Sequence, residues 1–237
     1  MLIHPLGGEL VVWEPVLDRL ARERDVIALD LPGFGDSPPL AHGAEPTPRV
    51  LAGAVASLLD ELGLGRAHVA GNSLGGWVAL ELAKAGRAQS VAGLCTAGCW
   101  TRPLGPRHGG DVRVVGRAIL PLVPMLVRSA RGRRLLLRGS VGHPDRVPPA
   151  AAARLVRSYV CSPGFEGANA AMRSAVFSGV EHIRVPVTLA WAELDRLVRR
   201  PRETVPKWRT VVLHGCGHVP TWDDPDQVAR VLLASSS

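Results

Sequence analysis

Short apolar runs alternate with longer amphipathic segments along most of the chain, and this alternation predicts strands and helices in turn. Runs rich in Val, Ile, Leu and Ala predict strands at 1–3, 25–30, 67–70, 90–95, 185–191 and 210–214. Helical spacing of apolar residues predicts helices at 10–23, 50–62, 75–85 and 225–234. Strands that alternate with helices favour an α/β fold with a mostly parallel sheet flanked by helices.

The rhythm changes between the strands at 90–95 and 185–191. Residues 100–179 contain no convincing strand, but helical patterns occur at 112–127, 150–160 and 168–177. A long helical insertion between two strands is typical of a cap over one edge of the sheet. We therefore expect a core formed by 1–99 and 180–237, and an inserted helical cap formed by 100–179.

The composition favours a single globular domain and argues against a nucleic-acid-binding or membrane-spanning protein. The chain has 237 residues, of which 46% are hydrophobic and 21% charged, enough for one sizeable core in one domain. The formal charge is +7, but the arginines come without an aromatic stacking platform, which argues against nucleic acid binding. The most apolar stretch, 118–127, is too short to span a membrane and is interrupted by Pro121 and Pro124. A role at a membrane surface for 112–134 remains an alternative.

Neither the start of the chain nor its cysteines indicate export or a metal. The first residues lack a basic segment followed by an apolar run, so we expect a cytoplasmic protein. The four cysteines do not form paired zinc-binding motifs, and free thiols are the default expectation. We predict no metal and no cofactor.

Candidate chemistry begins at Gly71-Asn72-Ser73-Leu74-Gly75, which matches the Gly-x-Ser-x-Gly nucleophile elbow. The motif lies directly after a predicted strand and directly before a predicted helix, which is the context that this turn requires. Small neighbours prevent clashes at the strained serine, and the start of the helix favours the negative charge of acyl transfer. A glycine-rich turn with an incidental serine is the alternative interpretation.

A serine nucleophile needs a base, and the base needs a group that orients it. His218 follows the last predicted strand and Asp195 follows the one before, so both are expected at the same sheet edge as Ser73. Glu193 is a competing acid, whereas Asp223 and Asp224 are expected to cap the final helix. Two further histidines, His68 and His214, fall within predicted strands and are expected to be packed in the core.

An oxyanion hole needs two backbone N–H donors. Leu74, which follows the nucleophile, is one candidate. The other is Leu6, in the turn that follows His4 at the end of the first strand, because Pro5 has no N–H. Gly7 gives this turn room for a close approach to substrate.

Four segments together resemble the α/β-hydrolase superfamily, in its capped branch of esterases, perhydrolases and C–C bond hydrolases. They are 4–8 with Trp13, 30–37 (Asp-Leu-Pro-Gly-Phe-Gly-Asp-Ser), 71–76, and 191–195 with Gly217-His218. The resemblance implies an α/β-hydrolase fold and hydrolysis without a cofactor. The serine at position 73 argues against the dehalogenase and epoxide-hydrolase relatives, which carry Asp there.

The chain departs from this family in three places. Pro5 and Ala192 stand where the family usually has glycine. The third departure is larger, because members normally carry two further strands before the one that begins here at Met1. Without them, the run 25–30 should form an exposed sheet edge that invites self-association.

We expect a Ser-His-Asp hydrolase that cleaves a small carboxylic ester, with an apolar acyl group, through an acyl-enzyme intermediate. The apolar residues of 119–127 are expected to pack on the core or to line the acyl pocket. Hydrolysis of a C–C or lactone bond by the same residues is the first alternative. A non-catalytic binding protein on this fold is the second.

Overall fold

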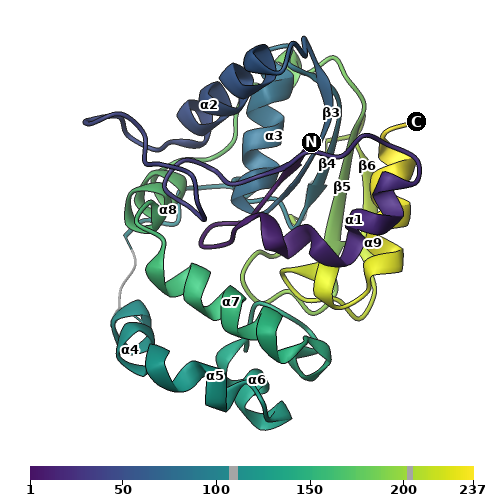
Figure 1. Cartoon of the computed structure of the whole chain (residues 1–237). Helices are drawn as coiled ribbons and strands as arrows, with labels where there is room; N and C mark the ends of the chain where they lie inside the picture. Colours follow the sequence, from purple (N-terminus) through teal and green to yellow (C-terminus); the bar gives the residue numbers. More distant parts are fainter. Residues whose placement is uncertain (107–111, 202–204) are drawn as a thin grey trace.

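The sheet contains six parallel strands in the order β2-β1-β3-β4-β5-β6 (Figure 1). The computed structural model describes residues 1–106, 112–201 and 205–237. The strands are β1 (Leu2–Ile3), β2 (Ala28–Leu29), β3 (Ala67–Asn72), β4 (Ala88–Leu94), β5 (Val187–Ala192) and β6 (Arg209–Leu213). The α/β prediction is confirmed, and β3 lies near the middle of the sheet, where its carboxyl end is flanked on both sides.

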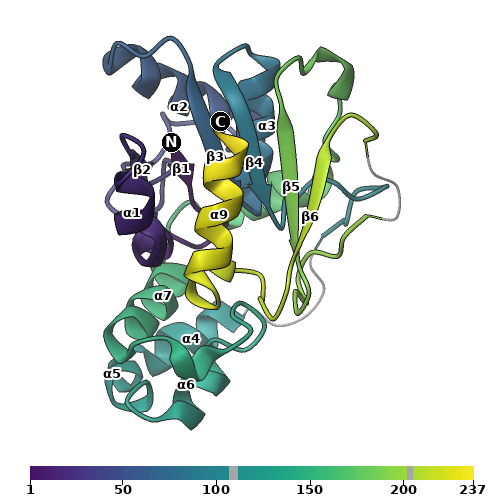
Figure 2. The ribbon, with the colours of Figure 1, turned by 90° about the vertical axis from the view of Figure 1, so that its right-hand side faces the viewer.

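Two layers of helix cover the sheet. On one face lie α1 (Glu14–Ala21) and α9 (Pro225–Ser235), and on the other lie α2 (Pro48–Glu61) and α3 (Leu74–Lys84) (Figures 1 and 2). The side chains of β5 alternate between these layers, as the period of two in a strand requires. Leu189 and Trp191 are buried on the α2 and α3 side, and Ala190 on the α1 and α9 side.

Between β4 and β5, the described residues form five α-helices. They are α4 (Val112–Ile119), α5 (Val123–Leu126), α6 (Ala130–Leu136), α7 (Pro149–Cys161) and α8 (Phe165–Ser174). The predicted helix 112–127 is broken by a 3-10 turn at Leu120–Leu122, because Pro121 and Pro124 cannot continue the α-helical hydrogen bonds. In Figures 1 and 2, α4 to α7 lie beyond the carboxyl ends of the strands, whereas α8 lies beside α2.

The apolar residues of 119–127 do not share one environment. Val123 and Val127 are each 2% exposed and pack in a small cluster with α7, whereas Leu122 and Met125 are 51% and 61% exposed. The expectation that this stretch faces the core or the acyl pocket is therefore wrong for Leu122 and Met125. None of the helices in the described ranges is long and apolar enough to cross a membrane.

One end of the sheet is formed by β2, in agreement with the sheet edge predicted at 25–30. The strand is shorter than the predicted run 25–30, and most of that run is half-buried rather than exposed. It stops before Asp30, whose carboxylate instead accepts the N–H groups of Leu10 and Asp36 at 2.6 and 3.1 Å. Asp30 thus holds the turn that follows the edge strand.

Short 3-10 turns complete the fold at Leu10–Trp13, Pro144–Arg146, Val180–His182 and Pro220–Trp222. At the start of α9, Asp224 accepts the N–H of Gln227 at 2.8 Å, which is the predicted helix cap. Asp223 does not cap this helix, and the prediction is wrong for that residue. Its carboxylate has other partners, which lie beside the candidate active site.

Candidate active site

A sharp corner between β3 and α3 holds Ser73. Its φ of 54° and ψ of −113° are rare for a residue with a side chain. The N–H of Ser73 donates to the carbonyl oxygen of Leu94 at 2.8 Å, and its own carbonyl oxygen accepts the N–H of Ala97 at 3.0 Å. A strained residue costs about 1–3 kcal/mol, persists only where its surroundings hold it, and is most often found at a functional site. These features make Ser73 the candidate nucleophile.

The corner leaves no space for side chains at its two motif glycines. A Cβ at Gly71 would lie 2.1 Å from the carbonyl oxygen of Gly75. A Cβ at Gly75 would lie 2.2 Å from the carbonyl oxygen of Ile3 in β1. The close approach of backbone to backbone therefore explains why this turn needs glycine at both positions.

His218 and Asp195 form a buried pair in the loops after β6 and β5. The Nδ1 of His218 lies 2.8 Å from Oδ2 of Asp195, and their side chains are 7% and 2% exposed. Burial alone raises the pKa of the Asp195 carboxyl, but the hydrogen bond and charge of His218 hold it below its ordinary value. The backbone N–H groups of Leu197 and Val198 donate to its other oxygen at 2.7 and 3.0 Å. Asp195 can thus remain ionised and orient the imidazole.

Cys95, at the end of β4, is a neighbour that the sequence did not single out. Its Sγ, an oxygen of Asp195 and a nitrogen of His218 lie within 4.8 Å of one another. Burial, followed by the charge of Asp195, raises the pKa of the Cys95 thiol well above its usual range. A thiol that keeps its proton is a poor metal ligand and a donor to the carboxylate. This favours a supporting role for Cys95.

Asn72 connects the corner at Ser73, here called the nucleophile corner, to the loop after β6 that carries His218, here called the histidine loop. Its Nδ2 donates to the carbonyl oxygens of Leu94 and His218, both at 3.0 Å. Within the described residues, the Ser73 hydroxyl makes no hydrogen bond to His218. Such bonds are often long in ligand-free enzymes and tighten when substrate binds. The structure therefore brings the loops of Ser73, His218 and Asp195 to one sheet edge without a closed Ser–His hydrogen bond.

Leu6 and Leu74 both keep their backbone N–H groups unused. Neither N–H has a hydrogen-bond acceptor among the residues that the structure describes. Leu6 follows β1 and Leu74 begins α3, and these elements meet where β1 lies beside β3. Donors without protein partners at this edge are what a developing oxyanion requires.

His4 supports the turn of Leu6 rather than the chemistry. It is fully buried, its Nδ1 donates to the carbonyl oxygen of Pro5 at 2.8 Å, and its Nε2 accepts the N–H of Leu31 at 2.9 Å. Burial lowers the pKa of His4 to about 4, so the ring is neutral near pH 7. Because both ring nitrogens form hydrogen bonds, His4 connects the end of β1 to the loop after β2 in one orientation.

The competing carboxylates have structural partners. Glu193 accepts the N–H of Gly215 at 2.9 Å. Asp223 accepts three N–H groups, from Gly142 and His143 in the insertion and from Gly217 beside His218, at 2.9, 2.7 and 2.7 Å. Asp223 therefore joins the inserted helices to the histidine loop, a contact between distant segments that the sequence pattern did not signal.

Two histidines differ in their surroundings. The side chain of His214 is 76% exposed, because β6 ends one residue earlier, and the prediction of a packed core histidine is wrong there. His68 lies in β3 and its Nδ1 is 2.9 Å from the hydroxyl of Ser90. Neither histidine belongs to the group around Ser73.

The corner between α7 and α8 covers the turn of Leu6. A Cβ at Gly7, where φ is 72°, would meet the rings of Tyr159 and Phe165 at 2.8 and 3.1 Å. Ser158 donates to the carbonyl oxygen of Gly7 at 3.1 Å. Two aromatic rings from the insertion thus lie directly over the candidate oxyanion turn, which needs glycine at position 7.

Arg113 fixes α4 to this corner. Its guanidinium is 1% exposed, pairs with Glu166 at 2.6 Å, and donates to the carbonyl oxygens of Val160 and Ser162 at 3.1 and 2.8 Å. It also lies 4.2 Å from the centre of the Phe165 ring. A buried arginine of this kind satisfies the carbonyl groups that end α7.

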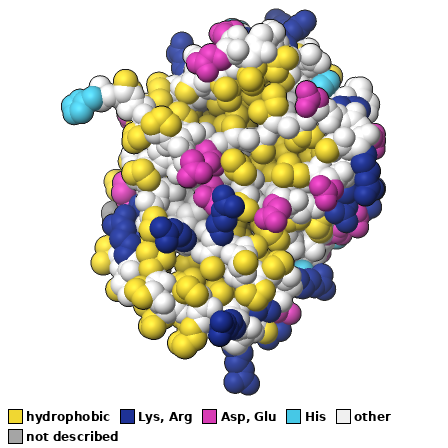
Figure 3. Space-filling model, viewed as in Figure 1, with side chains coloured by type: hydrophobic (Ala, Val, Ile, Leu, Met, Phe, Trp, Pro, Cys, Tyr) yellow, Lys and Arg dark blue, Asp and Glu magenta, His cyan; other side chains and the backbone are white. Residues whose placement is uncertain are grey.

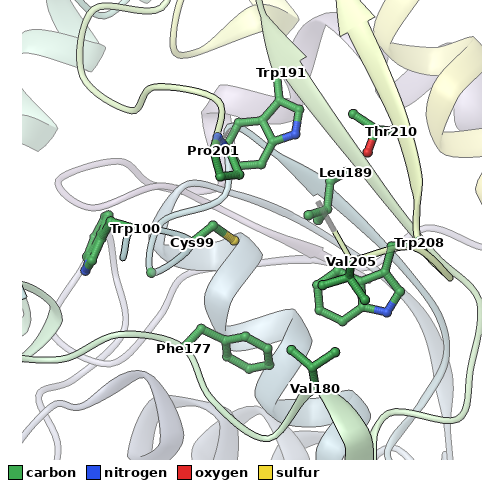
Figure 4. A pocket seen from close by; sticks show the side chains of 11 residues that line it. Cys99, Trp100, Phe177, Val180, Leu189, Trp191, Pro201, Val205, Trp208 and Thr210 are labelled. Atoms are coloured by element: carbon green, nitrogen blue, oxygen red, sulfur yellow. The ribbon is translucent and has the colours of Figure 1, made fainter. Parts of the chain in front are cut away.

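A separate cavity of about 170 Å³ lies on the α3 side of the sheet (Figure 4). Its walls are mainly aromatic and aliphatic. They come from β5, from β6, from the segments after β4 and α8, and from Pro201, Val205 and Trp208 between β5 and β6. Figure 4 shows Trp191 and Trp208 on one side and Trp100 and Phe177 on the other. Ser73, Asp195 and His218 do not line it, so we do not assign the acyl pocket to this cavity.

Comparisons with known proteins agree with the fold. A profile described as the alpha/beta hydrolase family matches residues 1–231. Epoxide hydrolase EphH of Mycobacterium tuberculosis is 32% identical over 200 residues, covering 78% of this chain and 92% of that protein. A protein of Pseudomonas savastanoi that bears the name carbamate hydrolase RutD is 28% identical over 246 residues, covering 98% of this chain and 91% of its own length.

A solved structure with the same architecture is the enol-lactonase from Burkholderia xenovorans, with a TM-score of 0.69 and 23% identity over 98% of this chain and 88% of the lactonase. At that identity the likeness shows the fold alone. The profile match spans nearly the whole length, including β1, the nucleophile corner and the histidine loop. The chain belongs to the alpha/beta hydrolase family, and it is a hydrolase by family and by the names of its relatives.

Proposed function

We propose that this hydrolase cleaves an acyl bond, most simply that of a small carboxylic ester, with Ser73 as nucleophile, His218 as base and Asp195 as orienting acid. The observation that carries the proposal is the strained serine at the strand-to-helix corner, beside a buried His–Asp pair 2.8 Å apart. A serine hydroxyl needs such a base to attack a carbonyl carbon.

The proposed reaction has two steps. Ser73 attacks the carbonyl carbon while Nε2 of His218 takes its proton, and the leaving alcohol receives that proton when the tetrahedral intermediate collapses. The N–H groups of Leu6 and Leu74 hold the oxyanion. Water, deprotonated by His218, then releases the acid from the acyl-enzyme. No step requires a metal or a cofactor.

The relative named as an epoxide hydrolase raises a second reaction, and the chemistry of Ser73 argues against it. Attack of a serine oxygen on an epoxide carbon would form an ether. An ether has no carbonyl carbon for water to attack, so the enzyme could not be regenerated by the same route. Attack on an ester, a carbamate or a lactone forms an acyl-enzyme that water can cleave. The proposal therefore keeps acyl substrates, with C–C and lactone cleavage as its alternatives.

The proposal assigns residues 1–99 and 180–237 to the core and 100–179 to a cap. The rings of Tyr159 and Phe165 over the turn of Leu6 support this assignment, since a substrate at Ser73 would lie between them and the sheet edge. Apolar rings at this position favour an apolar acyl group. Self-association through the edge strand β2 is a separate proposal, which size-exclusion chromatography of the chain would test.

The test is covalent labelling with a fluorophosphonate, followed by a series of p-nitrophenyl esters of increasing acyl length. We expect labelling of the natural chain, none of Ser73→Ala, and unchanged labelling of Ser57→Ala, whose exposed serine lies on α2. Turnover of Ser73→Ala should fall on the order of a millionfold, judged by the loss measured in another serine hydrolase. A folded natural chain that is not labelled would contradict the proposal and favour a binding role.

A further inference from the structure

The outer surface of α4, α5, α6 and the 3-10 turn Leu120–Leu122 carries a group of exposed apolar side chains, which we call the cap patch. Its members are Val112 (53% exposed), Val114 (60%), Val115 (63%), Leu122 (51%), Met125 (61%) and Leu135 (70%). Half of the large apolar side chains that are exposed in the described ranges lie in this one segment. Figure 3 shows hydrophobic side chains gathered over these helices at the lower end of the molecule.

The cap patch is distinct from the surface that packs these helices onto the protein. Inward-facing residues of the same segment, such as Val123 and Val127, are buried in the cluster with α7. All three helices contact α7, so their opposite faces point away from the sheet (Figures 1 and 2). Helices that are apolar on two faces need a second apolar partner, because soluble surfaces rarely leave such patches uncovered.

Charge on this segment has one sign. Residues 112–138 contain seven arginines and no aspartate or glutamate. Arg117, Arg128, Arg131 and Arg138 are exposed, and Arg134 is 60% exposed beside Asp145. Apolar side chains interspersed with exposed arginines are characteristic of helices that lie in the interface of an anionic membrane.

We propose that the cap patch docks on the surface of an anionic lipid bilayer, with its apolar side chains in the headgroup region and its arginines on lipid phosphates. A second copy of the chain fits less well, because a symmetric contact through this segment would place arginines against arginines without acidic partners. Resting on the proposed function, the docking also points to a substrate class. The inserted helices lie over the carboxyl edge of the sheet, so bilayer-soluble esters would be the substrates nearest to Ser73.

The experiment is flotation of the full chain with vesicles of phosphatidylcholine alone and with added phosphatidylglycerol, at low and high salt. We expect binding to the anionic vesicles and its loss at high salt. The paired change Leu122→Ser and Met125→Ser removes apolar contacts and should abolish flotation. The paired change Arg128→Gln and Arg131→Gln should weaken the partition coefficient on the order of tenfold or more, since each arginine contributes about fivefold near an anionic surface.

A matched control is the pair Leu62→Ser and Leu64→Ser, which are 48% and 36% exposed but lie outside the cap patch. Flotation of this control should equal that of the natural chain. No flotation with anionic vesicles, or equal flotation of the cap-patch variants, would overturn the proposal. Dimers that dissociate in the Leu122 and Met125 variant, with no vesicle binding by the natural chain, would overturn it in favour of self-association. Flotation is read without turnover, so an inactive chain leaves the result valid.

Discussion

His4 makes folding stability depend on pH in a defined window. Burial lowers its pKa to about 4 in the folded chain, whereas an unfolded histidine titrates near 6.5. Between these values the unfolded chain binds a proton at His4 that the folded chain does not. The free energy of unfolding therefore falls as pH decreases from about 6.5 to about 4, and the contribution is fully present above that window.

The size of the effect follows from the same two values. A depression of about 2.5 units corresponds to about 3 kcal/mol, at 1.36 kcal/mol for each unit. This is a large share of the roughly 5–15 kcal/mol by which domains are stable. The structural cause is that a proton on Nε2 would remove the acceptor for the N–H of Leu31 and place a charge where no solvent reaches.

The assay is urea unfolding at half-unit steps from pH 4.5 to 7.5, on the natural chain and on His4→Gln. Glutamine offers a similar donor and acceptor but does not titrate in this range. The buried amino group of Met1, whose pKa falls to about 6 mainly through burial, titrates in both chains and cancels in the difference. We expect the natural chain to lose stability relative to the variant by about 1.4 kcal/mol per pH unit within the window.

A stability difference that stays constant across this range would refute the reasoning. If His4→Gln does not fold, nuclear magnetic resonance of the natural chain gives the same answer. The ring protons of His4 should then show no titration between pH 8 and 5.

Three further predictions concern the candidate site. Gly75→Ala should prevent correct folding of the corner, because its Cβ would meet a backbone carbonyl of β1 at 2.2 Å. The control Gly53→Ala, whose Cβ would meet nothing within 4 Å, should stabilise α2 by about 0.5–1 kcal/mol. The urea midpoint of unfolding should therefore fall in the first variant and rise in the second. Asp223→Asn loses one of the two acceptor oxygens that hold the backbone beside His218, so fluorophosphonate labelling per folded molecule should slow on the order of tenfold. The control Asp224→Asn, at the cap of α9, should label at the natural rate. Loss of the base in His218→Ala should lower ester turnover on the order of a millionfold, and a folded variant that keeps the natural rate would exclude the role of His218 as base.

The parts of the site that the sequence predicts are those with strong local constraints. The nucleophile corner is predictable because a strand, a serine between glycines and a helix must follow one another there. The loops of Asp195 and His218 are predictable because parallel strands all end at the same edge of a sheet. In both cases the order of residues along the chain fixes their neighbourhood in space.

Contacts between segments that are distant in the sequence are the part of the structure that the sequence pattern does not predict. Nothing in the pattern indicates that Asp223 accepts N–H groups from residues 142 and 143, because that pairing depends on how the insertion folds back. Helix α6 was missed for a related reason. Its segment is short and rich in arginine, and it packs on the 3-10 turn Pro144–Arg146 and on α7 instead of showing an apolar period of its own.

The order in which the chain supplies its site also has a consequence for biosynthesis. Ser73 lies in the first third of the sequence, whereas His218 lies close to the end, after the last strand. Under the proposed mechanism, a polypeptide that has emerged only as far as α3 carries the nucleophile without its base. Acyl transfer by Ser73 would then begin only once the loop of His218 has joined the sheet edge, so a partly made chain would be unable to acylate itself or its surroundings.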